Sequence, residues 1–171
     1  EEIPLLKGAS GTFDEIRSNL ATSDFDGAEA VDFIIERAMA DDPRPLVLAP
    51  IGKLTNIALA LEKDPSIAGK VRIVWLGSNY PDAGEYNQDN DEPALNYILD
   101  TDVPFEIALV RGGKPSGTAA VRATGEEIEQ NMPGLGPKIA KPVAGRHGGE
   151  FSSFGDYSID LFRNANLHGD P

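Results

Sequence analysis

Carboxylates and amides crowd into the loop over residues 77–92, where Glu85, Tyr86 and Asn87 stand in succession. An acid and an amide beside an aromatic ring suit a ligand that carries vicinal hydroxyl groups, such as a sugar. The polar groups can exchange hydrogen bonds with the hydroxyls while the ring covers the carbon skeleton. An acidic loop can also be a solvated turn with no ligand. A buried strand directly before the loop favours a binding site.

The end of this loop offers further oxygen atoms in Asp89, Asn90 and Asp91. Asp91 stands just before Pro93 and the apolar positions of a predicted helix. Aspartate is favoured as a helix N-cap and proline in the first turn. We therefore expect Asp91 to cap this helix.

A second candidate is the turn Ile51–Gly52, which follows the short apolar stretch PLVLAP at residues 45–50. Backbone carbonyls at the end of a strand can ligate a hard cation such as Ca²⁺, which takes six to eight oxygens. A tight turn without a ligand is the alternative. Gly52–Lys53 suggests a phosphate loop only weakly, because the pattern GxxxxGK[ST] is not present.

Two histidines, His147 and His168, are candidates for a general acid, but the glycine beside each one favours the interpretation as a loop residue. The sequence contains no GxSxG nucleophile elbow and no CxxC or HExxH metal pattern.

The elements that must position these residues alternate along the chain. Residues 71–76 form an apolar run, interrupted only by Arg72, that is typical of a strand buried on both faces of a parallel sheet. Helices are predicted at residues 27–40, with Asp24 or Asp26 as N-cap, and at residues 55–63. Strands are predicted at residues 45–50 and 103–110.

This order predicts an α/β fold with an open, mostly parallel sheet and helices on both faces. The polar loop then lies at the carboxyl end of a strand, where such sheets bind ligands.

The chain changes character near residue 111, since 11 of its 18 glycines lie in residues 112–171. We expect residues 1–111 to form the sheet core of a single partial domain, and residues 112–171 to form an irregular and helical excursion. Thr124 and Glu127 have the spacing of a capping box at the start of a short helix, and a second helix is predicted near Asp156. Residues 134–154 are predicted to be a long mobile loop.

The net charge of −13 at pH 7 argues against nucleic acid and anionic membranes as partners. No apolar run reaches the roughly 20 residues of a membrane span. The absence of cysteine excludes disulfides but leaves the compartment open, either cytoplasmic or, if a signal has been removed, secreted or periplasmic.

Four segments together resemble the inosine-uridine nucleoside hydrolase family: AVDFIIERA at residues 30–38, IGKLTNIALAL at 51–61, EYN at 85–87 and NDEPA at 90–94. The family shows a G-x-LTNIA segment, a strand ending in MGG, an EFN triplet and a DPEA helix start. The similarity is good to about residue 110 and thinner beyond it.

The resemblance implies hydrolysis of the N-glycosidic bond of a ribonucleoside, with a Ca²⁺ ion holding the ribose diol and a water that an aspartate activates. It also implies a homo-oligomer. The roles carried over by motif are these: the backbone carbonyl of Ile51 ligates the metal, Glu85 and Asn87 hold ribose hydroxyls, Tyr86 replaces the usual Phe as a wall, Leu76 lies beneath the sugar, and Asn79 stands in for another ribose-binding Asn.

One departure from the family pattern outweighs these matches. The leading aspartate cluster DxDxxxDD, which supplies most metal ligands and the catalytic base in the family, is not found in this sequence. We therefore expect the chain to begin after that segment, and the isolated chain to be inactive. The alternative hypothesis is a non-catalytic sugar- or nucleoside-binding module.

Overall fold

The structure is a computed structural model that describes residues 4–112, 117–121 and 123–168. The chain divides into two compact units, Glu1–Ala120 and Val121–Pro171. The division falls nine residues beyond the change of character that the composition placed after Arg111. The first unit therefore includes the short strand Arg111–Gly112 and the 3-10 helix Gly117–Ala120.

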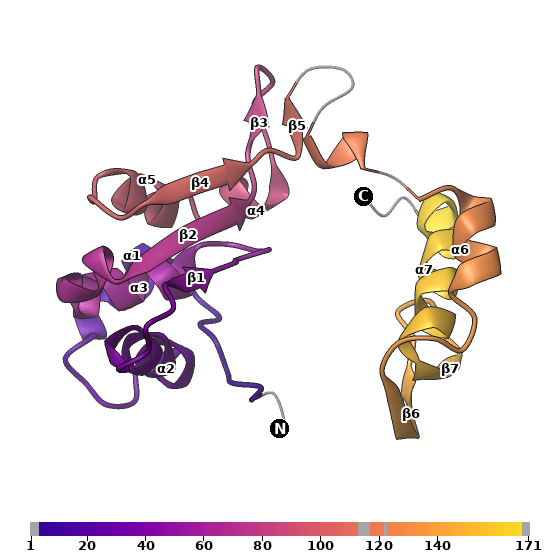
Figure 1. The fold of residues 1–171 in the computed structure, drawn as a ribbon, viewed down its shortest axis with the longest axis horizontal. Helices are drawn as coiled ribbons and strands as arrows, with labels where there is room; N and C mark the ends of the chain where they lie inside the picture. The colour runs from indigo at the N-terminus through magenta and orange to yellow at the C-terminus, as the bar shows by residue number, and fades with distance from the viewer. Residues whose placement is uncertain (1–3, 113–116, 122, 169–171) are drawn as a thin grey trace. The chain divides into compact units, whose positions relative to one another are not determined.

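A three-stranded parallel sheet organises the first unit, in the order β1 (Leu46–Leu48), β2 (Val71–Leu76) and β4 (Phe105–Ala108). Leu46 lies opposite Val71, and Ile73 lies opposite Phe105. Figure 1 shows the three strands running in the same direction. The predicted parallel sheet flanked by helices is confirmed.

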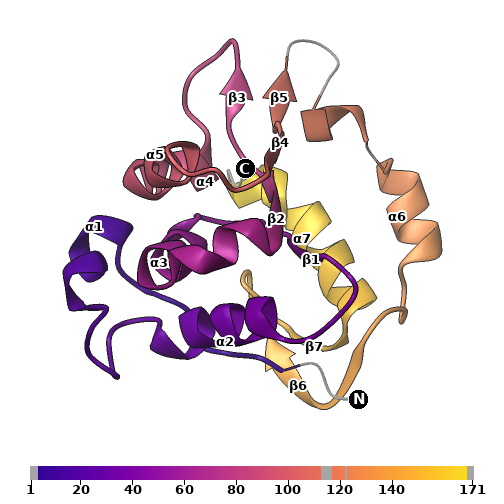
Figure 2. The ribbon, with the colours of Figure 1, turned by 60° about the vertical axis from the view of Figure 1, so that its left-hand side comes forward.

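The long helices of this unit are α2 (Ala28–Met39), α3 (Thr55–Lys63) and α5 (Glu92–Leu99). They lie together on one side of the sheet (Figure 2). Because the strands follow one another in order across the sheet, right-handed crossovers carry α3 and α5 to the same face. Burial along β2 therefore alternates, with Ile73 and Trp75 buried and Arg72 exposed, where the sequence had suggested a strand buried on both faces.

One hydrophobic core joins the helices to the inner face of β2. Its fully buried members include Val31 of α2, Leu59 of α3, Ile98 of α5 and Trp75 of β2. The shorter helices α1 (Phe13–Ile16), η1 (Arg17–Asn19) and η2 (Pro65–Gly69) close the margin of this core, to which Phe13, Ile16 and Ile67 contribute.

Helix α2 begins differently from the prediction, with Gly27 and not an aspartate as its N-cap. The carboxylate of Asp26 instead accepts hydrogen bonds from the backbone N–H groups of Ser10 and Gly11, at 2.7 and 2.8 Å. Gly27 has a φ of 90°, and a Cβ there would lie 2.7 Å from the backbone nitrogen of Ala9. The N-terminal segment at Ala9–Gly11 therefore explains both residues: Asp26 binds its N–H groups, and Gly27 leaves room for its backbone.

The remaining elements of the first unit surround the carboxyl ends of the strands. They are β3 (Asn79–Tyr80), β5 (Arg111–Gly112), α4 (Tyr86–Asp89) and η3 (Gly117–Ala120). Strands β3 and β5 pair in parallel and extend beyond the main sheet (Figure 1).

The second unit contains α6 (Gly125–Asn131), β6 (Lys138–Ala144), β7 (Glu150–Ser153) and α7 (Phe154–His168). The predicted capping box at Thr124 and Glu127 is present. The prediction of a mobile loop over residues 134–154 is wrong, because β6 and β7 form an antiparallel hairpin there. Strand β6 is exposed along its length and contains Pro142, so it lacks the alternation of apolar residues that reveals a strand in a sequence.

No helix in the described part of the chain combines the length and the apolar character needed to cross a membrane.

Candidate functional site

The candidate site lies where β2 ends. The indole N–H of Trp75 donates to the carbonyl oxygen of Gly52 at 2.8 Å, so this strand holds the turn that follows β1. Gly77 comes next, and Ser78 then adopts a φ of 62°. This abrupt change of direction sends the chain into the polar loop.

The side chain of Asn87 joins the ends of two neighbouring strands. Its Nδ2 lies 2.9 Å from the carbonyl oxygen of Leu76 and 3.4 Å from that of Ile51. Strand alignment brings these carbonyls together, because the N–H of Leu76 donates to the carbonyl of Pro50 at 3.1 Å. Three of the predicted site residues, Ile51, Leu76 and Asn87, therefore converge at one edge of the sheet.

Glu85 occupies the centre of the loop and is 8% exposed. Its carboxylate accepts hydrogen bonds from the N–H groups of Ser78 at 2.8 Å, Asn87 at 3.0 Å and Gln88 at 3.0 Å. It is thus the N-cap of α4 and also fixes the turn after β2. Its carboxylate places Asn87, and its predicted contact with ribose stays a prediction.

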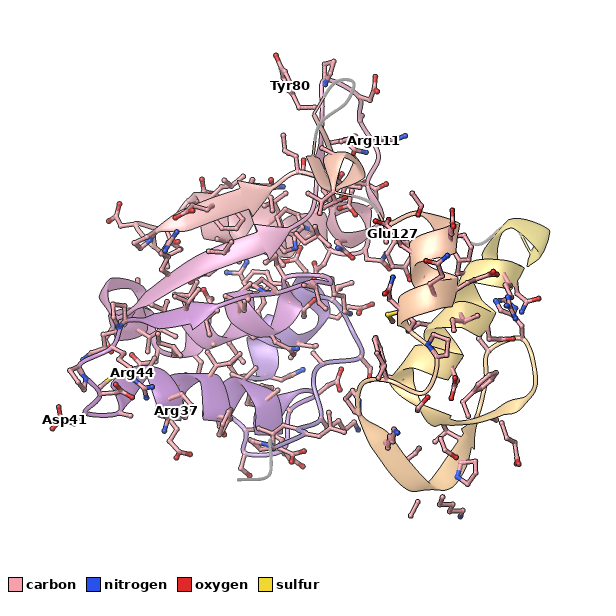
Figure 3. The ribbon with its side chains drawn as sticks, turned by 45° about the vertical axis from the view of Figure 1, so that its right-hand side comes forward. Arg37, Asp41, Arg44, Tyr80, Arg111 and Glu127 are labelled. Atoms are coloured by element: carbon pink, nitrogen blue, oxygen red, sulfur yellow. The ribbon has the colours of Figure 1, made fainter. Side chains whose placement is uncertain are left out.

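Asn79 braces the outer part of the loop. Its Nδ2 donates to the carbonyl of Gly84 at 2.6 Å, and its Oδ1 accepts from the N–H of Arg111 at 3.1 Å. Both ends of its amide are therefore bonded to backbone, and no hydrogen bond joins it to Asn87 within the described residues. Figure 3 shows Tyr80 and Arg111 at the projecting end that Asn79 supports.

Two predicted site residues present exposed side chains at this edge. Tyr86 is 75% exposed on the first turn of α4, and the side chain of Ile51 is 79% exposed. Tyr86 is therefore free to cover a ligand, as an aromatic wall would. The exposed side chain of Ile51 leaves its backbone carbonyl as the polar group directed toward Asn87.

Asp91 is a structural centre behind the site and is 3% exposed. Its Oδ1 accepts from the N–H of Ala94 at 3.3 Å, which confirms the predicted N-cap of α5. Its Oδ2 accepts from the N–H of Phe13 at 2.9 Å and from the hydroxyl of Thr55. One carboxylate therefore joins α1, α3 and α5.

Lys53, the residue behind the weak phosphate-loop interpretation, has a different use. Its Nζ donates to the carbonyls of Ser10 at 3.0 Å and Gly11 at 2.5 Å. The neighbouring Asp26 accepts from the N–H groups of the same two residues, and these hydrogen bonds lower the pKa of Asp26 from its usual 3.8. Lys53 and Asp26 together hold the N-terminal segment at Ser10 and Gly11 against the rest of the first unit.

Sequence reasoning missed Trp75, Ser78 and Gly77 as residues that shape the site. A Cβ on Gly77 would lie 2.1 Å from the Trp75 ring, so any larger residue forces the ring or the backbone to move. A glycine directly after a buried strand was the available signal, but the partner ring could not be read from the sequence.

Calcium prefers six to eight oxygen ligands, usually with several carboxylates. Among the side chains that the structure describes, no three His, Cys, Asp or Glu residues gather into a group that could hold a metal ion. The Ile51 carbonyl supplies one oxygen. The described residues thus do not by themselves make up the calcium site that the resemblance predicts.

The histidines are remote in sequence from this edge. His147 lies in the turn between β6 and β7 of the second unit, and His168 is the last residue of α7. The structure describes no side chain for His168. Neither residue is therefore assigned a role in this site.

Comparison with known proteins gives a consistent result. The sequence model of a family described as inosine-uridine preferring nucleoside hydrolase matches residues 2–171. The chain is 34% identical over 152 residues to the pyrimidine-specific ribonucleoside hydrolase RihB of Escherichia coli, covering 88% of this chain and 45% of that protein. It is 41% identical over 56 residues to the inosine-uridine preferring nucleoside hydrolase of Leishmania major, covering 32% of this chain and 18% of that protein.

A solved structure shares the fold. The purine-preferring ribonucleoside hydrolase from Gardnerella vaginalis superposes with a TM-score of 0.57 at 24% identity, over 75% of this chain and 48% of that one. The chain spans about half the length of the Escherichia coli and Gardnerella vaginalis proteins, 45% and 48% respectively.

Proposed function

Because the chain belongs to the inosine-uridine preferring nucleoside hydrolase family, we propose that it forms the sugar-facing edge of an enzyme that cleaves the N-glycosidic bond of ribonucleosides. The products are ribose and a free base. The observation that carries this proposal is the convergence of the Asn87 amide on the carbonyls of Ile51 and Leu76. This convergence supports the roles that the resemblance gives to the EYN triplet and to Ile51.

In this proposal Asn87 binds a ribose hydroxyl and the exposed ring of Tyr86 covers the sugar. Glu85 holds Asn87 in place through the N–H groups at the start of α4. A free oxygen lone pair on Glu85 can still accept from a second hydroxyl, because a carboxylate has about four acceptor positions and three are used. Asn79 acts through the loop that it braces.

Calcium dependence belongs to the same proposal. Calcium would supply an anchor for the ribose diol, with the Ile51 carbonyl as one ligand. The acidic ligands that the family draws from its DxDxxxDD cluster are not found in residues 1–171. The described residues hold no group of carboxylates that could take over that work. We accordingly propose that the 171-residue chain by itself binds ribonucleosides without hydrolysing them.

Two measurements test this function. Purified chain is incubated with inosine or uridine, with Ca²⁺ or with a chelator, and free base is measured by chromatography. We expect no base release. Release that the chelator abolishes would show that the chain alone is catalytic.

Binding is measured by NMR titration with the same nucleosides. We expect Asn87→Ala to weaken binding at least tenfold, about 1.4 kcal/mol, and Asn90→Ala to leave it unchanged. Asn90, the exposed C-cap of α4, is a matched control, since among the described residues its side-chain amide donates to the Tyr86 carbonyl and to no other group. Equal binding by both variants would contradict the role of Asn87.

The second candidate function is a sugar- or nucleoside-binding module without catalysis. It is favoured because no three His, Cys, Asp or Glu side chains among the described residues gather into a possible metal site. The coding sequence upstream of residue 1 separates the two. An in-frame DxDxxxDD segment supports the enzyme, and a complete gene without it supports the binding module.

A further inference from the structure

A cavity of about 540 Å³ lies at the opposite edge of the sheet, near the amino ends of the strands. Its walls come from the end of α2, the loop that leads into β1, and the end of η2 just before β2. The lining residues are Arg37, Ala38, Ala40, Asp42, Pro43, Arg44, Pro45, Leu46, Gly69 and Lys70. Because β1 begins at Leu46 and β2 at Val71, this cavity is separate from the edge where Asn87 lies.

The charge of this cavity is opposite to that of the chain. The chain has a net charge of −13, whereas the lining contains Arg37, Arg44 and Lys70 and a single carboxylate, Asp42. Figure 3 shows Arg37 and Arg44 on the same side of the unit. A concentration of cations in an acidic protein raises the local concentration of anions.

The one carboxylate is already bound. Asp42 accepts from the Arg44 side chain at both of its oxygens, from Nη2 at 2.6 Å and from Nε at 2.9 Å, and from the Arg44 backbone N–H at 3.0 Å. This bidentate ion pair gives both Asp42 oxygens a hydrogen-bond partner within the same loop. Arg37 also interacts electrostatically with Asp42. Three cations therefore face one carboxylate, and positive charge remains in excess at this cavity.

Arg37 and Lys70 have no hydrogen bond or ion pair to another side chain in the described part of the chain. Arg37 lies in the last turn of α2, where a cation also complements the carbonyl end of the helix. That structural role explains one cation in this position. It does not explain why Lys70, from a different element, lines the same cavity.

We propose that this cavity binds a small phosphate-bearing anion through Arg37 and Lys70. Guanidinium and ammonium groups are the usual donors to phosphate oxygens. The volume is within the range of cavities that hold small metabolites. Pro43 and Pro45 restrict the loop that carries Arg44, so the cavity wall loses little conformational freedom on binding.

The test is a calorimetric titration of the 171-residue chain at low salt with inorganic phosphate, ribose 5-phosphate and ribose. We expect both phosphates to bind. Heat from uncharged ribose is assigned to the edge at Asn87, so the titrations are repeated with the Asn87→Ala variant. In that variant, tighter binding of ribose 5-phosphate than of inorganic phosphate identifies an organic phosphate as the ligand, and equal binding identifies phosphate itself.

Two double variants locate the site. Arg37→Gln with Lys70→Gln is expected to weaken phosphate binding at least tenfold. Lys138→Gln with Lys141→Gln, which removes the same charge from exposed positions of β6 in the second unit, is expected to leave it unchanged. Equal loss in both variants would mean general attraction to charge, and no loss in the first, or no binding by the unaltered chain, would overturn the proposal.

Amide chemical shifts of the unaltered chain give a readout that does not depend on any substitution. On addition of phosphate we expect the largest shifts at residues 37–46 and 69–70. Shifts confined to other segments would show an adventitious ion only.

Discussion

The indole ring of Trp75 fills the space where a side chain on Gly77 would begin, with its Cζ2 atom 2.1 Å from the position of a Cβ. The same ring is completely buried and binds the Gly52 carbonyl. The Trp75 ring therefore links the core to the turn at Gly52 and to the turn at Gly77.

Gly77→Ala should destabilise the first unit by about 2 kcal/mol, because overpacking against a buried ring forces side chains or backbone to move. Chemical denaturation measures the effect, with Gly69→Ala as control, since nothing lies within 4 Å of a Cβ there. In a Trp75→Leu background the added methyl group should cost clearly less, as a double-mutant cycle would show. Equal costs in the two backgrounds would mean that the ring is not the obstacle.

Asp91→Asn should lower the free energy of unfolding by about 3 kcal/mol. The new amide directs an N–H group toward the Phe13 N–H and the Thr55 hydroxyl, and leaves buried donors without an acceptor. Asp89→Asn, at an exposed position of α4, is the matched control and should change stability little. Similar unfolding midpoints for the two variants would contradict the role of Asp91 as a centre that joins three helices.

Glu85→Gln should disturb the loop more than the core. The carboxylate accepts three backbone N–H groups, and an amide can replace only part of this acceptance. We expect a loss of about 2 kcal/mol in stability and faster amide hydrogen exchange at Ser78, Asn87 and Gln88. Glu92→Gln, on the exposed first turn of α5, should leave these exchange rates unchanged. Unaltered exchange in Glu85→Gln would argue against a positioning role.

The lowered pKa of Asp26 predicts that the stability of the chain depends on pH. The N–H groups of Gly11 and Ser10 hold its pKa below the usual 3.8, so the folded chain binds this proton less readily than the unfolded chain does. The resulting stabilisation is present above pH 3.8 and is lost as the pH falls through the lowered pKa. Thermal unfolding of Asp26→Asn should therefore show a lower midpoint than the unaltered chain at pH 7.

The difference between the two midpoints should shrink below pH 3.8. Asp24→Asn serves as the control for removal of a nearby exposed charge. A difference that stays constant from pH 7 to pH 3 would show that the charge of Asp26 makes no contribution through these hydrogen bonds.

The local pattern of the sequence was sufficient for the main elements of the first unit. Apolar spacing located α3 and β2 at the residues where the structure has them, and the alternation of helix and strand predicted a parallel sheet with the polar loop at a carboxyl edge. These features follow from periodicity and capping, which act over a few residues. For the same reason Asp91 and Thr124 could be assigned as caps.

Only the tertiary structure decided which groups meet. The approach of Asn87 to Ile51 spans 36 residues, and the bond from Phe13 to Asp91 spans 78. The hairpin of β6 and β7 is exposed and gives no apolar alternation, so its pairing could not be read from side chains. Distant contacts of this kind depend on strand order and crossover direction, which place residues that the sequence alone leaves far apart.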